Sequence, residues 1–238
     1  MKKILSLALS SLLFFSCENN RINGDGNLKS SSRKLSTFKS IIVDLPATIT
    51  IDCNDTNNSI CEINAEANTQ NYIIAEVKEN ELVLTTKRNS NVIFNKPVTI
   101  KISTKNLEEI KVLGSCNVTI DGKPKSNTFV AALMGSGNIT VNNANCNAIK
   151  AELSGSGNIY YEDCTTHQAN YDLKGSGNID AKTSNAKSVV AVLTGSGNIN
   201  CIADSALDTR IVGSGNVYYT GNATITKHNN GSGEVIKH

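Results

Sequence analysis

This sequence of 238 residues has few histidines, almost no excess of one charge sign over the other, and few long apolar runs. Only His167, His228 and His238 are present, and no C-x-x-C pair occurs, so the ligand spacing typical of zinc sites is absent. The formal net charge is +2, and the sequence has no basic stripe with interleaved aromatic residues. Nucleic acid is therefore not expected as a partner. Beyond Cys17, no apolar run is long enough for a transmembrane helix.

The first residues, MKKILSLALSSLLFFSC, have the features of a secretory signal. Two lysines precede an apolar core, Ile4 to Phe15, that is too short to span a bilayer. Ser16 directly before Cys17 resembles a bacterial lipobox, although Phe14 stands where leucine is usual. We therefore expect lipidation of Cys17 and export as an outer-membrane lipoprotein that faces the periplasm or the cell surface. The alternative is an ordinary cleaved signal followed by an incidental cysteine.

The composition changes after the signal and then gives way to one long patterned region. Residues 1–16 are the expected signal peptide, and residues 17–35, rich in Asn, Gly and Ser, are predicted to be a flexible tether. The remaining chain, about 200 residues, is long enough for a single domain with a continuous core.

Export permits disulfides, and six cysteines remain after the signal. Cys53 and Cys61 flank NDTNNSI between two alternating segments, so a hairpin there would bring them opposite each other. Cys146 and Cys164 lie in polar stretches of consecutive repeats and form a second candidate pair. Cys201 falls in an apolar column and is expected to be a core thiol.

The most informative pattern is GSGNI, which recurs with small changes through the second half of the chain. Its first glycines are spaced by 21, 20, 20, 20, 18 and 18 residues, at Gly114, Gly135, Gly155, Gly175, Gly195, Gly213 and Gly231. Apolar and polar residues alternate on both sides, as in KAELSGSGNIYYE, which indicates two strands per repeat rather than a helix. The same positions are apolar in every repeat, which predicts an all-β, parallel β-solenoid with coils about 4.8 Å apart. A propeller blade would need about 40 residues.

The GSGN motif itself is predicted to be a structural corner. Glycine and asparagine tolerate positive φ better than other residues, and stacked asparagine amides can bond from coil to coil. The stacked asparagines would be Asn117, Asn138, Asn158, Asn178, Asn198 and Asn216. A phosphate-binding loop would require a helix after the motif, whereas a strand follows here. The calcium-binding nonapeptide repeat does not match either, and no metal or cofactor is expected.

Residues 36–113 also alternate, but they lack the GSGN corner. We interpret them as irregular N-terminal coils and a cap, with a tight turn at KENEL, and residues 114–238 as regular coils of the same solenoid domain. At the C-terminal end, Glu234 replaces the asparagine and Lys237 an apolar residue, which is typical of a polar edge strand.

Several stretches together resemble the head GIN domain family, whose members are called auto-transporter adhesins. They are STFKSIIVDLPATITI, ENELVLTT, VTIKIST, LEEIKVLGSCNVTI, the serial LxGSGNI and VYYTGNATITKHNNGSGEV. The resemblance covers nearly all of residues 36–238. It implies a single-stranded right-handed parallel β-helix, with coils of about 18–21 residues by the spacing above, in a secreted or lipid-anchored protein of Bacteroidetes type. Cys116 departs from the pattern because it stands where a corner glycine is expected.

Three functions are compatible with the sequence. The favoured one is an adhesin or binding module for polysaccharide or protein, with the outward Tyr160 and Tyr218 as candidate contacts. The second is a structural or assembly component of the envelope. The third is a polysaccharide-active enzyme that would use Glu152 and Asp172, one coil apart on an outer face. Nearby lysines indicate a charge-balanced surface instead, so no catalytic residue is assigned.

Overall fold

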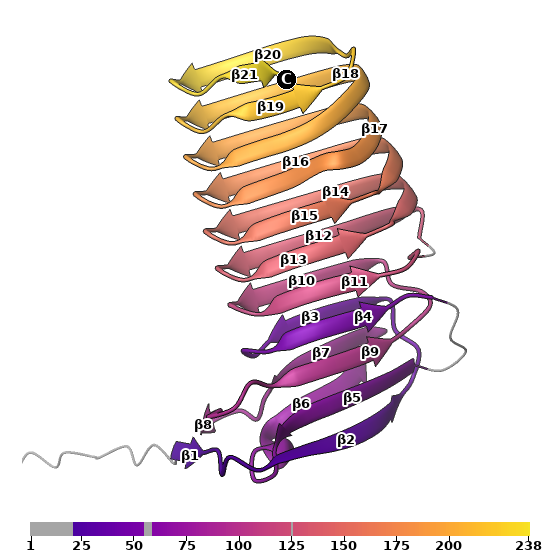
Figure 1. The fold of residues 1–238 in the computed structure, drawn as a ribbon, viewed down its shortest axis with the longest axis vertical. Coiled ribbons are helices and arrows are strands. Elements are labelled where there is room, and N and C mark those ends of the chain that lie inside the picture. The colour runs from indigo at the N-terminus through magenta and orange to yellow at the C-terminus, as the bar shows by residue number, and fades with distance from the viewer. Residues whose placement is uncertain (1–20, 55–58, 125) are drawn as a thin grey trace, which may run out of the picture.

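The computed structural model describes residues 21–54, 59–124 and 126–238. These residues form a stack of β-coils in which two layers of strands face each other (Figure 1). The short 3₁₀ helix η1 (Gln70–Tyr72) is the one helical element among them. Within the described part of the chain, no helix has both the length and the apolarity to cross a membrane. The predicted all-β parallel solenoid is confirmed.

One layer, sheet A, contains the strands that run into the glycine corners, together with strands of the N-terminal coils. In spatial order, beginning at the N-terminal end of the stack, these are β6 (Ile73–Lys78), β7 (Glu81–Thr86), β3 (Ser40–Asp44), β10 (Glu109–Gly114), β12 (Thr128–Gly135), β14 (Asn145–Gly155), β16 (Thr165–Gly175), the second halves of β17 (Asn178–Gly195) and β18 (Asn198–Gly213), and β20 (Thr224–Gly231).

The other layer, sheet B, contains the strands that leave the glycine corners, together with strands of the N-terminal coils and cap. Its order is β2 (Leu28–Leu35), β5 (Ser59–Glu66), β9 (Thr99–Ser103), β4 (Thr48–Asp52), β11 (Asn117–Asp121), β13 (Asn138–Asn142), β15 (Asn158–Glu162), the first halves of β17 and β18, β19 (Val217–Thr220) and β21 (Val235–Lys237). A separate parallel pair joins β1 (Arg21–Asn23) to β8 (Asn91–Ile93).

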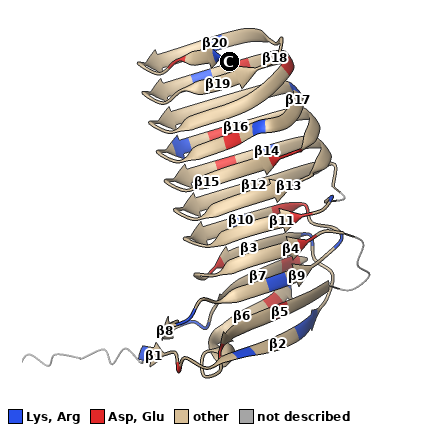
Figure 2. Cartoon of the chain, in the orientation of Figure 1, with Lys and Arg blue, Asp and Glu red and all other residues tan. Residues whose placement is uncertain are grey.

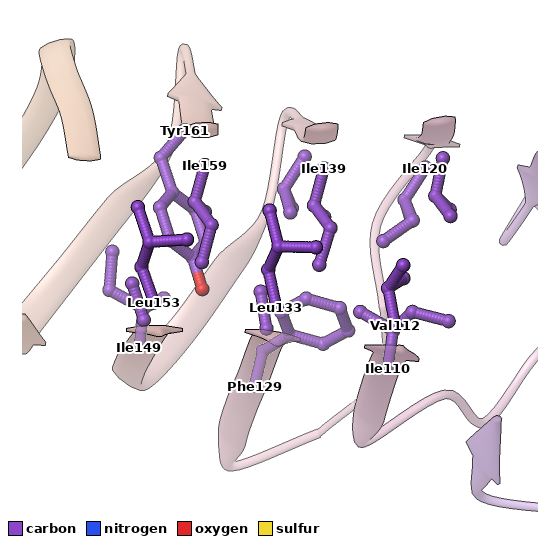
Figure 3. Close-up of a cluster of buried hydrophobic side chains, with 14 of the residues drawn as sticks. Ile110, Val112, Ile120, Phe129, Leu133, Ile139, Ile149, Leu153, Ile159 and Tyr161 are labelled. Atoms are coloured by element: carbon purple, nitrogen blue, oxygen red, sulfur yellow. The ribbon is translucent and has the colours of Figure 1, made fainter. Parts of the chain in front are cut away.

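The core lies between the two sheets and repeats from coil to coil. In sheet A, Leu153 pairs with Leu133 below and Leu173 above, and in sheet B Ile159 lies in register between Ile139 and Ile179. All six are at most 2% exposed. Figure 3 shows the same arrangement of apolar side chains repeated in successive coils. No coil can bury its own apolar side chains alone. Because the registers are identical, the apolar side chains of each coil pack on those of the coils above and below.

Two tyrosines enlarge the core where the neighbouring coils have small residues. Tyr161 lies in the column of Val141 and Ala181, and its hydroxyl donates to the carbonyl oxygen of Lys150 at 2.8 Å. Its ring centroid is 6.4 Å from that of Tyr171. A buried phenol needs such an acceptor, and the large rings fill the space left by small neighbours.

The GSGN corners are tight because each coil lies directly on the backbone of the one below. The first glycine has φ of +129° at Gly175, and a Cβ there would lie 2.2 Å from the carbonyl oxygen of Gly155. The second glycine, Gly177, needs no positive φ, but its Cβ would lie 1.9 Å from the carbonyl oxygen of Gly157. The corner therefore uses one glycine for conformation and both for space, and its asparagine is not in the left-handed region.

Cys116 ends this file of glycines without strain. The coil below it, formed by β3 and β4, has a different corner. There the backbone N–H of Asn117 donates to the carbonyl oxygen of Ala47 at 3.0 Å. Cys116 itself is fully buried.

The corner asparagines form a ladder of amide hydrogen bonds along the stack. The Asn158 Nδ2 donates to Asn138 Oδ1 at 3.0 Å, and Asn158 Oδ1 accepts from both Nδ2 and the backbone N–H of Asn178, at 3.0 and 3.2 Å. At the upper end, Asn216 Oδ1 accepts the backbone N–H of Glu234 at 2.9 Å. The rungs at Asn178, Asn198 and Asn216 also accept the backbone N–H of the residue above them in the ladder, which is Asn198, Asn216 and Glu234 in turn.

Removing one rung should be costly. We expect Asn178→Ala to lower the free energy of unfolding by about 2 kcal/mol, because the Asn198 N–H, which donates to Asn178 Oδ1 at 3.1 Å, loses its acceptor in a confined place. Asn200→Ala, on the same sheet but with no hydrogen bond of its side chain to a described residue, should change it by less than about 0.5 kcal/mol. Equal values in urea denaturation would contradict a stabilising ladder.

The N-terminal coils do not stack in chain order. The coil of β3 and β4 is inserted between that of β7 and β9 and that of β10 and β11, so Val43 pairs with Leu84 on one side and Val112 on the other. The coil of β3 and β4 is therefore second in the stack, although its residues precede those of the first coil, β7 and β9, in the sequence. The tight turn between β6 and β7 has positive φ at Glu79 and Asn80.

The predicted tether of residues 17–35 needs correction, because residues 21–35 are part of the fold. β2 pairs antiparallel with β5 along its whole length and covers the open end of sheet B. The Arg33 guanidinium donates to the carbonyl oxygens of Ile73 and Gln70, at 3.0 and 3.4 Å. A capping strand needs backbone pairing on one edge and little apolar surface, so its Ser- and Lys-rich composition is compatible with order.

A buried carboxylate fastens the segment before β2 to this cap. Glu66 is fully buried, and its two oxygens accept the backbone N–H groups of Gly26 at 2.7 Å, Asn95 at 2.8 Å and Lys96 at 3.3 Å. A Cβ on Gly24 would lie 1.9 Å from Glu66 Oε2, so this close approach requires glycine.

The C-terminal end of the stack is closed by polar residues. Lys227 and Lys237 occupy positions that are inward in the coil below, where Thr209 and Tyr219 stand. The Lys227 Nζ donates across the end of the stack to the carbonyl oxygen of Val235 at 3.3 Å. Charged edge strands of this kind oppose uncontrolled strand addition.

Candidate binding face

The outer surface of sheet B carries one file of side chains that point away from the core. In register from coil to coil, the file is Thr140, Tyr160, Asp180, Asn200 and Tyr218. All five are partly exposed. Tyr160 and Tyr218 are three coils apart, which corresponds to about 14 Å at the usual strand spacing. The coils hold these side chains at fixed intervals on a rigid support.

A hollow of about 340 Å³ lies beside Tyr160. Its lining residues are Tyr160, Tyr161, Glu162, Asp163, Asp180, Lys182 and Thr183. Asp180 is held in place because its Oδ1 accepts the Lys182 backbone N–H at 3.2 Å and its Oδ2 pairs with Lys182 Nζ at 3.2 Å. An aromatic ring next to fixed carboxylates can stack on an apolar ring face and accept hydrogen bonds from hydroxyl groups.

Tyr218 is less available than Tyr160. Its ring stacks on His238, with centroids 5.1 Å apart and planes at 24°. Its hydroxyl accepts a hydrogen bond from Asn216 Nδ2 at 3.2 Å. No described residue makes a ring contact or a side-chain hydrogen bond with Tyr160. The structure therefore separates two tyrosines that look equivalent in the sequence.

The two acidic candidates on sheet A are neighbours, but each has its own cation. Glu152 pairs in register with Asp172. Glu152 forms an ion pair with Lys150, and Asp172 with Lys174 at 2.9 Å. The hydrogen bond from Lys174 to Asp172 raises the pKa of the Lys174 ammonium, and the negative charge of the Asp172 carboxylate adds to this effect. This part of sheet A is a charge-balanced surface, without the hydrogen-bonded acid and base that hydrolysis requires.

The cysteine predictions need correction at Cys53 and Cys61. The expected hairpin does not form, because β9 lies between β4 and β5 and Cys61 faces Ile102 in the register. Both cysteines are free and buried.

Cys146 and Cys164 are also free thiols, so the second candidate disulfide is absent. In the register Cys146 stands next to Thr166, not next to Cys164. The Cys164 thiol donates to the carbonyl oxygen of Glu162 at 3.4 Å. Cys164 lies two residues before the register partner of Cys146, which explains why consecutive repeats do not bring the two sulfurs into a bond.

Burial makes the thiols poor nucleophiles. It raises the pKa of Cys201 to about 12, and it raises that of Cys53 to about 12 with smaller contributions from Asp52 and Asp121. Burial also raises the pKa of Cys146 and of Cys164. Since the thiolate is the reactive form, these cysteines are structural at neutral pH. Among the residues that the structure describes, no His, Cys, Asp and Glu cluster could hold a metal ion. The candidate lipidation site, Cys17, lies outside the described residues.

Sequence reasoning missed the hollow and the buried Glu66. The hollow depends on the turn after β15, where Asp163 has φ of +53° and its N–H donates to Thr183 Oγ1 at 3.3 Å. These turn residues do not follow the repeat. For Glu66 the available signal is weak, since it stands in an alternating segment that reads as an ordinary strand.

In-register parallel coils with glycine corners and long polar outer faces define this protein as a β-solenoid. The chain belongs to the family described as "Putative auto-transporter adhesin, head GIN domain", whose model matches residues 37–223. No protein with a curated description matches it.

Solved structures support the same assignment. A crystal structure of a "putative adhesin" from Bacteroides fragilis is 25% identical, with a TM-score of 0.85 over 91% of this chain and 100% of that one. One from Parabacteroides distasonis, also called a "putative adhesin", is 22% identical, with a TM-score of 0.76 over 92% and 100%, and supports the fold alone. A third, from the same organism, is 26% identical, with a TM-score of 0.71 over 92% and 99%, and is called a "putative lipid binding protein". The family and the first two neighbours are named adhesins, not enzymes.

Proposed function

We propose that this protein is a lipid-anchored adhesin of the cell envelope that binds polysaccharide on the outer face of sheet B. The observation that carries the proposal is the partly exposed ring of Tyr160 beside a hollow lined with carboxylates. Sugar rings have an apolar face that stacks on an aromatic side chain, and hydroxyl groups that donate to carboxylates. The rigid spacing of the coils adds further polar side chains along an extended ligand.

The family supports the adhesive part of this proposal, and the sequence of the first residues supports the anchor. Members are described as adhesins, and adhesion requires a binding surface held outside a membrane. The signal and Cys17 would supply the attachment, since each buried methylene of an acyl chain contributes about 0.8 kcal/mol. Labelling with palmitate tests this part: incorporation should occur in the native chain and be lost in Cys17→Ser.

Glycan binding tests the face. A glycan array probed with the mature protein should give polysaccharide hits, and Tyr160→Ala should weaken binding to the best hit about tenfold, equivalent to about 1.4 kcal/mol. Tyr160→Phe keeps the ring and should retain most of the affinity. Tyr218→Ala is the matched control and should have a smaller effect, because His238 already covers one face of that ring.

The other candidate roles are outcomes of the same experiment. If no glycan binds, or if Tyr160→Ala binds as well as the native protein, the polysaccharide proposal is wrong. A structural role in the envelope, with a protein as partner, would then be favoured. Release of reducing ends from a bound glycan would instead indicate an enzyme.

A further inference from the structure

A group of exposed basic residues gathers at the N-terminal end of the stack. We call it the basic corner and define it by five residues from two segments: Arg21, Lys29, Lys87, Arg88 and Lys96. All five are exposed, and none forms an ion pair with a described residue. Figure 2 shows blue at β1, on the chain leading to β8 and on β2, at the end of the stack opposite the C-terminus.

The two segments are fastened together by backbone contacts. β1 pairs with β8, so Arg21 stands opposite Asn91, and the Gly24 N–H donates to the carbonyl oxygen of Ile93 at 2.9 Å. The buried carboxylate of Glu66 then accepts N–H groups from both segments. The backbone that carries the five basic residues is therefore held in a fixed arrangement.

The charge of this corner stands out against the rest of the molecule. Segments 21–30 and 87–96 contain the five basic residues and a single acidic one, Asp25, whereas the whole chain has a formal charge of only +2. Leu28, which is 51% exposed, lies in the same region and is one of the two large apolar side chains that the described residues leave exposed. A lipid bilayer has anionic head groups at its surface and apolar acyl chains beneath them. Unpaired basic side chains next to an exposed leucine are complementary to such a surface.

The chain length places this corner close to a membrane. Only three residues lie between Cys17 and Arg21, so a lipidated Cys17 would keep Arg21 within about 14 Å of the lipid surface even if the link were fully extended. Electrostatic attraction to a charged surface acts within about 8 Å at physiological ionic strength. A link that is less than about half extended brings Arg21 into that range, and the pairing of β1 with β8 places the other segment beside it.

We propose that the basic corner is a membrane-contact surface that binds the anionic head groups of phospholipids. The proposal rests on the lipid anchor of the proposed function for its setting. Its effect is to hold the N-terminal cap against the bilayer, so that the two sheet faces stand beside the membrane rather than on it.

Vesicle sedimentation tests the surface without the anchor. The chain from residue 17 with Cys17→Ser keeps every strand of the fold and carries no acyl group. It should sediment with vesicles containing about one third phosphatidylglycerol in phosphatidylcholine and not with pure phosphatidylcholine, and raising the salt should release it. Each basic residue near such a surface contributes about 1 kcal/mol, so the variant K29Q/K87Q/R88Q should lose roughly fivefold in partitioning for each charge removed.

A matched control removes the same charge elsewhere. The variant K187Q/R210Q/K237Q changes three basic residues of the C-terminal half and should bind as the Cys17→Ser parent does. Circular dichroism melting should show that both variants remain folded. Equal binding to neutral and anionic vesicles, or equal losses in the two triple variants, would overturn the proposal.

The test also distinguishes this surface from the anchor. If palmitate is incorporated at Cys17 but the unlipidated chain shows no preference for anionic vesicles, the anchor stands and the membrane-contact surface is wrong. If palmitate is not incorporated but the preference is found and lost in K29Q/K87Q/R88Q, the surface stands and the anchor fails.

Discussion

Leu153→Asp is expected to abolish the cooperative unfolding transition of the domain. Leu153 is 2% exposed and lies in register between Leu133 and Leu173, so an aspartate there would place a carboxylate among stacked leucines without a partner. Burying an unpaired charge costs several kcal/mol, in addition to about 2–5 kcal/mol for the lost leucine packing. The sum reaches the 5–15 kcal/mol that stabilises a typical domain. Circular dichroism during heating measures the loss.

The neighbouring residue supplies the control. Ser154 is the next residue of the same strand, but it is exposed and lies beside Lys174 in the register. Ser154→Asp introduces the same charge on the outer face and should leave the unfolding free energy within about 0.5 kcal/mol of that of the parent. Similar destabilisation by both substitutions would show that the inward and outward assignment of β14 is wrong.

Gly175→Ala is the second substitution with a large expected effect, about 2–6 kcal/mol of unfolding free energy. The φ of +129° is a region that only glycine occupies without strain, which costs about 1–3 kcal/mol for another residue. The new Cβ would also lie 2.2 Å from the Gly155 carbonyl oxygen, and a rigid backbone atom cannot give way as a side chain does. Overpacking adds about 1–3 kcal/mol. Urea denaturation gives the value.

Two further substitutions separate these contributions. Gly114 also has positive φ, at +90°, but a Cβ there would meet nothing within 4 Å, so Gly114→Ala should cost only the conformational part. Ser176→Ala, in the same corner as Gly175 but exposed, should be nearly neutral. If Gly175→Ala costs no more than Gly114→Ala, then contact between the coils does not require the glycine.

The regular coils could be predicted because their sequence repeats every constraint. Leu153, Ile159 and Asn158 recur with the same offsets from a glycine, and only in-register stacking satisfies all of these offsets at once. The alternation of side chains then identifies Tyr160 as outward and Leu153 as inward. Parallel pairing between equal repeats leaves no freedom in the register.

The N-terminal coils could not be ordered in the same way. Without the glycine motif, nothing in the sequence states that β4 is the partner of both β9 and β11. The pairing of β4 and β5 as a hairpin was the simplest expectation for neighbours in the chain, and the insertion of β9 between them is a long-range effect. β2 was missed for a related reason, since backbone pairing at an edge leaves little trace in composition.

The candidate face was predictable in direction but not in detail. Alternation places Tyr160 and Tyr218 outside, yet their difference comes from His238 and Asn216, which belong to the end of the stack. The hollow beside Tyr160 depends on Asp163 and Thr183, turn residues that vary between coils. The structural differences between coils on this face arise where the repeat is broken.

The identical register of Gly155, Gly175 and Gly195 makes the length of this protein adjustable in discrete steps. Deleting residues 156–175 would join one corner to the next at equivalent backbone positions, and duplicating them would add a coil by the same logic. Each step changes the height of the molecule by about 4.8 Å and leaves both ends unaltered. The number of repeats therefore sets the distance between the C-terminal end of the stack and the N-terminal cap, and duplication or loss of a single repeat changes that distance by one step.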